Sequence, residues 1–516
     1  MRVSRLKEKD VLYMLNDYWK QFKSGTDIRG VASEGVQGQD VNLTDDAVAA
    51  MANGFLLWLC KKTGKKPGKL KIACGRDSRI SGPRIIGVVT KTLMEAGAHV
   101  LDCGLASTPS MFMTTIDLSC DGAVQITASH HPFNRNGLKF FVPQGGLEGS
   151  DIEEILNYAQ NGETPEKEQG GTIEAIDYMK DYAKRLRDMI CKEVNASDFD
   201  LPLKGFHIVV DAGNGAGGFY AKDVLEPLGA DTSGSQFLEP DGMFPNHVPN
   251  PEDEAAMQSV CKAVMDAKAD LGVIFDTDVD RGGAVGADGR EINRNRLVAI
   301  ASAIALEGNE GGTVVTDSIT SSGLKEFIEN TLGGVHCRFK RGYKNVINEA
   351  LRLNAKGINC PLAIETSGHA AMRENYFLDD GAYLCTKIII KMAKLKKAGK
   401  RLEDLIAQLK EPVESKEIRI KIKEKDFKPC GNAVLAGLET YAKNHDGWHI
   451  AQDSREGVRV SFDKDNGDGW FLLRLSVHDP IMPLNIESDS QGGVQTILEK
   501  VTAFLKGCDG IDTTVL

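Results

Sequence analysis

The chain has 516 residues, of which 41% are hydrophobic and 26% are charged, and its formal net charge is −11 from 62 Lys and Arg and 73 Asp and Glu. This composition is typical of a soluble globular protein and excludes collagen-like, fibrous and wholly disordered classes. At roughly 100–200 residues per domain, the length predicts three to five domains. No broad basic region is present, so we expect no nucleic-acid partner.

The apolar runs of the sequence are short. The longest, such as residues 55–60, cannot span a bilayer, so we expect no membrane partner. The first fifteen residues are charged throughout, which argues against a signal peptide. We therefore expect a cytoplasmic protein, with a plastid location also open if a transit peptide has been removed.

Three segments share one pattern along the chain: an apolar, β-branched run, then a Gly/Asp/Ser loop, then a helical pattern. They are residues 69–78, 205–215 and 312–323. Strand, polar loop and helix form the repeating unit of parallel α/β architecture. We therefore expect three related α/β domains, with ligands at the carboxyl ends of their strands.

The last hundred residues follow a different pattern. Residues 416–423 and 458–462 alternate apolar and polar side chains, and residues 469–477 form another strand-like run. Alternation of this kind predicts half-buried antiparallel strands. We therefore predict a smaller α+β domain after a lysine-rich helix at about 380–398. The four predicted domains are 1–172, 173–308, 309–412 and 413–516.

A polar turn at 127–141 lies between two apolar runs in the first predicted domain. It contains Ser129, two histidines, a proline and an Asn-Gly pair. A rigid turn that presents a hydroxyl suits a nucleophile or a phosphate acceptor, although a Ser/Asn turn without chemistry would look the same. No G-x-S-x-G motif occurs, which disfavours a nucleophile-elbow hydrolase.

An acidic loop, AspThrAspValAspArgGlyGly, follows the apolar run LeuGlyValIlePhe in the second predicted domain. Asp276, Asp278 and Asp280 concentrate negative charge, and a divalent cation is its natural neutraliser. Oxygen ligands suit Mg²⁺. The EF-hand reading fails because Arg281 and Ala287 stand where that loop needs Gly and Glu. Arg281 offers a fork for a phosphate or a neighbouring carboxylate.

Two further loops combine hydrogen-bonding side chains at strand ends. Residues 365–371, GluThrSerGlyHisAlaAla, offer the donors and acceptors that a polyhydroxylated ligand needs. Residues 474–480, ArgLeuSerValHisAspPro, offer a phosphate-binding set. Residues 213–218 match G-x-G-x-x-G, but we interpret them as a tight turn and helix start rather than a dinucleotide site.

These loops, in this order, resemble those of the α-D-phosphohexomutase family, which includes phosphoglucomutase and phosphomannomutase. SerGlyThrAspIleArgGly at 24–30 is similar to that family's opening loop, and ValValAspAlaGlyAsnGly and AspGlyMetPheProAsnHisValProAsnProGlu to its second domain. The resemblance covers the chain from about residue 24 to its end. It implies an α/β fold: three related α/β domains with mixed sheets and a C-terminal α+β domain, arranged around a central cleft.

The resemblance also implies roles for individual residues. Ser129 would carry the phosphoryl group and, with Asp276, Asp278 and Asp280, hold one Mg²⁺ per chain. The catalytic set would be Ser129, His130, Arg29, Lys139 and His369. The substrate-binding set would be Glu365, Ser367, Arg281, Lys340, Lys344, Arg474, Ser476 and His478.

The implied activity is interconversion of hexose 1-phosphate and hexose 6-phosphate, of glucose or mannose, with hexose 1,6-bisphosphate as activator, by a monomer or homodimer. The fourth loop departs from the family pattern. Pro483 stands near the place of a second Arg, for which Arg455 or Arg459 could compensate. A non-catalytic sugar-phosphate-binding homologue, a hexosamine phosphate mutase and a metal-dependent phosphatase therefore remain alternatives.

Overall fold

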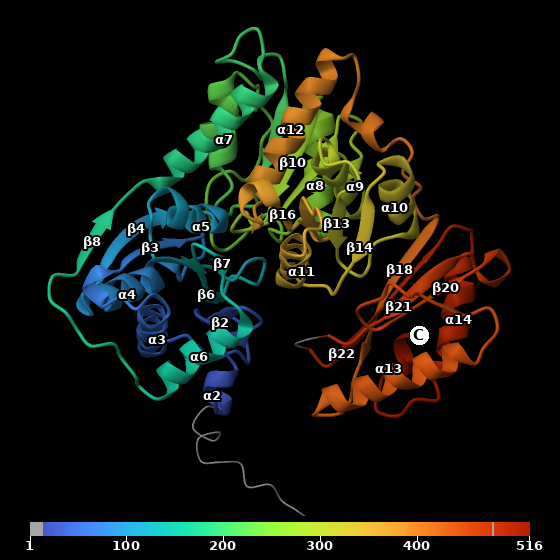
Figure 1. Ribbon diagram of the computed structural model, residues 1–516, viewed down its shortest axis with the longest axis horizontal. Helices are drawn as coiled ribbons and strands as arrows, with labels where there is room; N and C mark the ends of the chain where they lie inside the picture. Colours follow the sequence, from blue (N-terminus) through green and yellow to red (C-terminus); the bar gives the residue numbers. More distant parts are fainter. Residues whose placement is uncertain (1–13, 477–478) are drawn as a thin grey trace, which may run out of the picture. The chain divides into compact units, whose positions relative to one another are not determined.

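The computed structural model describes residues 14–476 and 479–516. These residues form four β-sheets with their flanking helices (Figure 1). The chain divides into two compact units. One comprises the chain up to Asn293 with Ser367–Ala370 and Leu378–Leu402, and the other comprises Arg294–Thr366, Ala371–Phe377 and Glu403–Leu516.

The first sheet has eight strands in the order β1-β2-β6-β5-β3-β4-β8, with β7 paired to β6. It is mixed, because β3 runs parallel to β4 and β5 whereas β6 runs antiparallel to β2 and β5. The apolar faces of helices α3, α4 and α6 bury one side of it. The strands are β1 Lys23–Ser24, β2 Asp27–Val31, β3 Lys71–Arg76, β4 His99–Leu105, β5 Gly122–Ile126, β6 Arg135–Val142, β7 Gly145–Gly146 and β8 Thr172–Ala175; the helices are α2 Asp17–Lys20, α3 Asp45–Thr63, α4 Gly82–Glu95, α5 Thr108–Asp117, α6 Gly149–Gln160 and α7 Tyr178–Val194.

The second sheet belongs to the same compact unit and has the order β12-β11-β10-β9. Strands β9 and β10 are parallel, and β11 returns antiparallel to β10. Its strands are β9 Ile208–Asp211, β10 Leu271–Phe275, β11 Gly282–Gly286 and β12 Glu291–Ile292, with helices α8 Glu254–Ala267 and α12 Gly381–Lys397. The predicted lysine-rich helix is thus present as α12, and it packs against β11 and α7.

The third sheet has the order β14-β13-β15-β16-β17. Strand β13 is parallel to both of its neighbours. Its strands are β13 Thr313–Thr316, β14 Val335–Arg338, β15 Leu362–Ile364, β16 Ala370–Met372 and β17 Leu378–Asp379, with helices α9 Arg294–Leu306, α10 Ser322–Glu326 and α11 Tyr343–Ala355. All three predicted strand–loop–helix segments therefore supply a strand, namely β3, β9 and β13.

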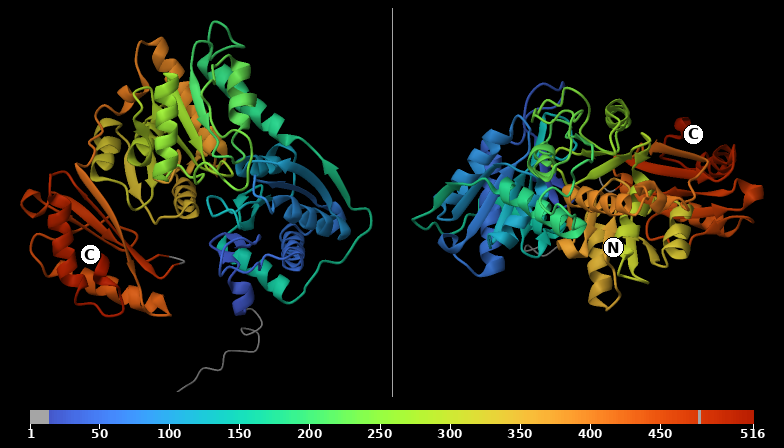
Figure 2. Two further views of the ribbon diagram at one scale, coloured as in Figure 1. Left: turned by 180° about the vertical axis from the view of Figure 1, so that it is seen from behind. Right: turned by 90° about the horizontal axis from the view of Figure 1, so that it is seen from above.

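The fourth sheet is antiparallel, in the order β18-β22-β21-β20-β19. Figures 1 and 2 show helices α13 and α14 together on one of its faces. The alternation of β18 fits this arrangement, because Ile418 and Ile420 are buried whereas Glu417 and Arg419 are exposed. The strands are β18 Glu414–Lys421, β19 His449–Ile450, β20 Val458–Phe462, β21 Gly469–Leu473 and β22 Ile481–Ser488; the helices are α13 Phe427–Lys443 and α14 Gly493–Leu505.

The fold class is therefore as predicted: three α/β domains with mixed sheets and a C-terminal domain built on an antiparallel sheet. Helix α9 lies in the same compact unit as β13, β14 and β15, whereas β17 and α12 lie in the unit of the second sheet.

Candidate active site

The turn after β5 holds Ser129 in a strained conformation. Its φ of 50° lies in the left-handed region, which residues other than glycine rarely occupy. The Ser129 N–H donates to Thr127 Oγ1 at 2.9 Å, and Thr127 Oγ1 donates to Asp77 Oδ2 at 2.8 Å. Ser129 is 3% exposed. The turn therefore presents its hydroxyl from a fixed backbone.

A fully buried arginine, Arg79, holds this turn in place through hydrogen bonds. Arg79 pairs with Asp77 through Nε at 3.2 Å and donates from both terminal nitrogens to main-chain carbonyls of the turn. Its acceptors are the carbonyl oxygens of Ser129, His131, Pro132 and Arg135. Because one rigid guanidinium satisfies several buried carbonyls, the turn is fixed as a unit.

The acidic loop follows β10 directly. Asp276, Asp278 and Asp280 are all buried, and one ligand atom from each lies within 4.8 Å of the others. Val279, between the second and third acid, has a φ of 68°, which is strained for a β-branched residue. Its carbonyl accepts from the N–H of Gly381, at the start of α12, at 3.0 Å. This backbone conformation thus directs the three carboxylates toward one point.

Ser129 and the acidic loop meet. Ser129 Oγ lies 3.2 Å from Asp276 Oδ2, although 147 residues separate them in sequence. Arg281 Nη2 donates to the same Oγ at 2.8 Å and also contacts His130 Nδ1. Arg281 is 3% exposed. A hydroxyl, a carboxylate and a guanidinium therefore converge, as phosphoryl chemistry requires.

Lys139 and His369 both lie at Asp280. Lys139 Nζ donates to Asp280 Oδ2 at 2.6 Å, and His369 Nε2 lies 3.6 Å from Asp280 Oδ1. His369 Nδ1 is 3.0 Å from Ser367 Oγ, and His369 forms an antiparallel bridge with Arg281. Two groups that can hold a proton thus flank one acid of the triad.

Burial and neighbouring charges shift the pKa values of the three aspartates in different directions. Burial and the charges of Asp280 and Asp278 raise the pKa of Asp276 well above its ordinary value, and burial and Asp280 raise that of Asp278. Burial also acts to raise the pKa of Asp280, but Lys139, His369 and Arg281 outweigh it and lower that pKa. Arg281 Nε also lies 3.4 Å from Asp276 Oδ2, but of the three acids only Asp280 has its pKa lowered by these cations, so a further cation would favour ionisation of Asp276 and Asp278.

The donor set fits a hard divalent cation. Asp278 Oδ1 and Asp280 Oδ1 are buried and accept no hydrogen bond from any residue that the structure describes. Such orphaned carboxylate oxygens are costly unless a cation binds them. With Ser129 Oγ beside Asp276, these oxygens form a set of the type that Mg²⁺ prefers.

Two further predicted catalytic residues lie near Ser129. His130 Nδ1 is 3.3 Å from Ser129 Oγ. Burial, together with the charge of Arg281, lowers the pKa of His130 to about 2, so its imidazole is neutral. Arg29, on β2, pairs with Asp27 at 2.8 Å, and its Nε meets no acceptor among the described residues. Its charge contributes to the lowered pKa of His130.

The remaining predicted substrate-binding residues belong to the other compact unit, except Ser367. Glu365 is 3% exposed and accepts the Gly342 N–H at 2.5 Å, so it adjoins the segment that carries Lys340, before α11, and Lys344, in the first turn of α11. Arg474 and Ser476 follow β21, where their N–H groups donate to Pro483 O and Ile481 O at 3.1 and 3.0 Å. His478 lies outside the described residues.

Three supporting residues were missed at the sequence level. Thr108 donates from Oγ1 to Asp278 Oδ2 and from N–H to Asp278 O. Asn250 accepts from Arg281 Nη1 at 3.0 Å, and Arg79 holds the Ser129 turn. Asn250 falls within the ProAsnProGlu stretch that resembles the family, which was a usable signal. Thr108 carried none, because its partner is 170 residues away.

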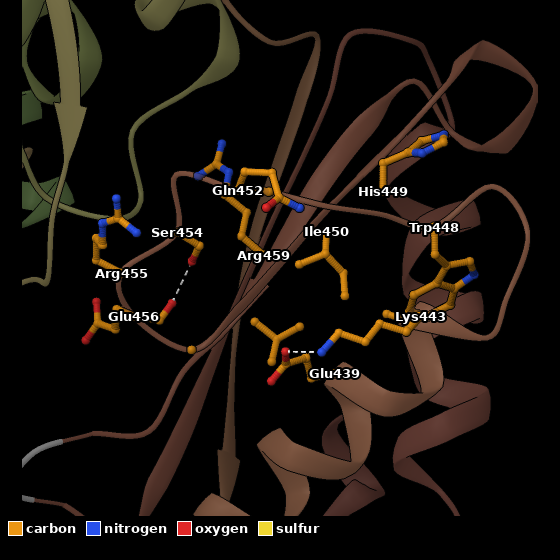
Figure 3. Close-up of a pocket in the computed structure, with 14 residues that line it drawn as sticks. Glu439, Lys443, Trp448, His449, Ile450, Gln452, Ser454, Arg455, Glu456 and Arg459 are labelled. Atoms are coloured by element: carbon orange, nitrogen blue, oxygen red, sulfur yellow. Dashed lines mark hydrogen bonds and ion pairs between the residues drawn. The ribbon is translucent and has the colours of Figure 1, made fainter.

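A separate polar cavity of about 890 Å³ lies in the C-terminal domain, between the end of α13 and the β19–β20 segment (Figure 3). Ser454 Oγ donates to Glu456 O at 3.1 Å across its rim. Arg455 and Arg459 also line it.

No helix among the described residues is long and apolar enough to cross a membrane.

Three family models match the chain in succession. They are phosphoglucomutase/phosphomannomutase alpha/beta/alpha domain I at residues 20–166, domain II at 180–289 and domain III at 293–412. Together they cover most strands of the three mixed sheets and the loops that carry Ser129, the aspartate triad and Glu365.

Several named proteins are similar over most of the chain. A "Phosphoglucomutase" of Neisseria gonorrhoeae is 29% identical over 482 residues, covering 93% of this chain and 95% of that protein. A "Phosphoglucomutase/phosphomannomutase" of Thermococcus kodakarensis is 30% identical, covering 92% and 95%. A crystal structure of a phosphoglucomutase/phosphomannomutase family protein from Burkholderia thailandensis superposes with a TM-score of 0.76 at 26% identity, covering 96% and 99%. The chain therefore belongs to the phosphoglucomutase/phosphomannomutase family, the α-D-phosphohexomutases, which are isomerases.

Proposed function

We propose that the protein interconverts hexose 1-phosphate and hexose 6-phosphate, of glucose or mannose, through a phosphoserine at Ser129 and a bisphosphorylated sugar. The observation that carries the proposal is the convergence of Ser129 Oγ, the carboxylate of Asp276 and the guanidinium of Arg281. The names of the relatives, phosphoglucomutase and phosphomannomutase/phosphoglucomutase, support the two sugars.

One Mg²⁺ per chain would be held by Asp276, Asp278, Asp280 and Ser129. When bound, the ion supplies the positive charge that neutralises a transferring phosphoryl group. Hexose 1,6-bisphosphate is the proposed activator, because it can phosphorylate an empty Ser129.

Ser129 holds the phosphoryl group, and Arg281 orients it through its buried fork. In the first transfer, the bond between Ser129 Oγ and phosphorus breaks while a bond forms between phosphorus and the free hydroxyl oxygen of the sugar phosphate. The proton of that hydroxyl passes to a base beside Asp280, where Lys139 and His369 lie. After the bisphosphate turns around, Ser129 accepts the other phosphoryl group and the proton returns to the new hydroxyl.

The remaining predicted substrate-binding residues are proposed to bind the rest of the substrate. Glu365 and Ser367 would accept hydrogen bonds from sugar hydroxyls. Lys340, Lys344, Arg474, Ser476 and His478 would bind the phosphate that does not react. We place these residues in a four-domain chain divided near 172, 308 and 412, acting as a cytoplasmic monomer or homodimer.

The decisive experiment replaces the acceptor hydroxyl. Ser129→Ala should lower kcat by orders of magnitude in a coupled assay with Mg²⁺ and a trace of glucose 1,6-bisphosphate, and should abolish the phosphoserine in intact mass spectra. Ser302→Ala is the matched control, since this buried hydroxyl donates only within α9, to Val298 O at 2.7 Å.

Four substrates, the 1-phosphates of glucose, mannose, glucosamine and N-acetylglucosamine, should be compared in that assay. Wild-type turnover of the two hexosamine phosphates alone would identify a hexosamine phosphate mutase. Binding of sugar phosphates without turnover of any of them would identify a regulatory homologue and refute the proposal.

A further inference from the structure

Three residues form a row across the C-terminal sheet at the predicted phosphate loop. The Arg474 N–H donates to Pro483 O on β22 at 3.1 Å, and Pro483 is paired with Arg419 on β18. Residues directly opposite each other on neighbouring strands project to the same face of the sheet. Arg474, Pro483 and Arg419 therefore share one face, with the proline between the two arginines.

This face is the one that helices α13 and α14 leave uncovered. On β18, Ile418 and Ile420 point into the apolar core. Arg419 points the other way, and its side chain is 71% exposed. The strand spacing of roughly 4.8 Å places the Cα atoms of Arg419 and Arg474 about 10 Å apart. Two long arginine side chains can close on one tetrahedral anion across that distance, above the short proline ring.

Arg474 is ready to bind a further acceptor. Its Nε is buried and finds no hydrogen-bond acceptor among the described residues. Burial lowers the pKa of Arg474, and the charge of Arg341 contributes to this while that of Glu456 opposes it. An anion placed here would relieve both the orphaned donor and the desolvated charge.

A carboxylate orients Arg419 without burying it. Arg419 Nε donates to Glu417 Oε1 at 2.9 Å, and Asn485 Nδ2 holds the other oxygen, Oε2, at 3.1 Å. Glu417 is also close enough to Arg341 and Arg474 to interact with their charges. Three guanidinium groups and the carboxylates of Glu417 and Glu456 thus share one neighbourhood. Guanidinium groups suit a dianionic phosphate.

Arg455 and Arg459, the two arginines that precede β21, do not supply the second guanidinium beside Arg474. Arg459 is 4% exposed, donates to Ser318 O and Thr320 O at 3.0 and 3.1 Å, and stacks on Trp470 at 3.5 Å. Its guanidinium therefore fastens β20 to the loop after β13. Arg455 lines the separate cavity beside β19 and β20 (Figure 3).

We propose that Arg419 is a substrate-binding residue that supplies, from β18, the second guanidinium for the non-reacting phosphate of the sugar. It would take the place of the arginine that the family pattern puts where Pro483 stands. The inference rests on the proposed function for the identity of the ligand, but the site itself needs only a sugar phosphate, whether or not it is turned over.

Calorimetric titration with glucose 6-phosphate tests this directly and does not depend on turnover. Arg419→Ala and Arg419→Gln should each weaken the Kd about 10–100-fold, the loss expected for a charged hydrogen bond, whereas Arg419→Lys should retain most of the affinity. In the Arg419→Ala background, Pro483→Arg should restore binding, because it returns a cation to the same row. Arg352→Ala is the matched control, since Arg352 is a half-exposed arginine paired with Glu349 at 2.6 Å.

Thermal melting of each variant establishes that it is folded. A wild-type Kd in Arg419→Ala would overturn the proposal. So would an Arg419→Lys variant as weak as Arg419→Gln. A wild-type protein that binds glucose 6-phosphate without isomerising it would refute the mutase function while leaving the Arg419 test intact.

Discussion

Lys139 Nζ lies 2.6 Å from Asp280 Oδ2, and both side chains are almost completely buried. This pair joins the first sheet to the acidic loop of the second, since Lys139 lies on β6 and Asp280 follows β10. Arg281 Nε lies 3.4 Å from Asp276, and the charge of Lys139 acts to lower the pKa of Asp278, but burial and Asp280 outweigh these cations and raise both pKa values. Removal of Lys139 should therefore change both the stability of the fold and the catalytic rate.

Lys139→Met should leave the Asp280 carboxylate buried beside Asp276 and Asp278 with its closest cation removed. Breaking one partner of a buried pair costs about 3–5 kcal/mol. We expect a correspondingly lower free energy of unfolding in urea without Mg²⁺, part of which returns when Mg²⁺ is added, and a kcat reduced by about 10²–10⁴-fold. Equal stability of the variant and the wild type without Mg²⁺ would contradict this account.

Thr108→Val should weaken Mg²⁺ binding, because it removes the hydroxyl that donates to Asp278. Residues that orient metal ligands typically contribute about 10–100-fold to metal affinity. Isothermal titration with Mg²⁺ measures the change. Thr115→Val is the control: this hydroxyl is also buried in α5, but it donates to Phe112 O at 2.7 Å. Identical Mg²⁺ affinities in the two variants would argue against a role for Thr108.

Gly368→Ala should displace His369 from Asp280. Gly368 has a φ of 94°, and a Cβ there would lie 2.6 Å from the carbonyl oxygen of Gly282. We expect kcat to fall at least about tenfold, as for other small displacements of catalytic groups.

The control is Gly399→Ala. Its φ of 68° imposes a similar backbone cost, of roughly 1–2 kcal/mol, but no heavy atom of the described chain lies within 4 Å of the new Cβ. If Gly399→Ala lowers kcat as much as Gly368→Ala does, close packing at Gly282 is not the cause.

His247 should make stability depend on pH. Burial acts to lower its pKa, but the hydrogen bond and the charge of Asp211 outweigh burial and raise the pKa above 6.5. A raised pKa in the folded state stabilises the fold fully below the unfolded pKa, and this contribution is lost as the pH rises through the folded pKa. The free energy of unfolding should therefore fall more steeply above pH 6.5 in the wild type than in His247→Gln. His449→Gln, at an exposed histidine, should keep the wild-type slope.

Local chemistry in the sequence was sufficient to predict several of the strands, the lysine-rich helix and the chemical groups of the loops. The alternation of β18, the apolar run of β10 and the Gly/Asp/Ser loops after β3, β9 and β13 each reflect burial or turn requirements that act within a few residues. The loops of Ser129 and of Asp276–Asp280 were recognisable for the same reason, since their residue types limit what chemistry is possible.

What the tertiary structure decided is which of these groups meet. Ser129 Oγ and Asp276 are brought within 3.2 Å by the packing of two sheets, and Thr108 reaches Asp278 across 170 residues, a contact to which no local pattern corresponds. Residues distant in sequence likewise determine which arginines are available to bind a ligand. Arg459 looked available for a phosphate, yet carbonyls of Ser318 and Thr320 hold it, whereas strand register sets Arg419 in line with Arg474. Periodicity in a sequence reports which face a side chain occupies, but only the pairing of strands and sheets fixes its neighbours.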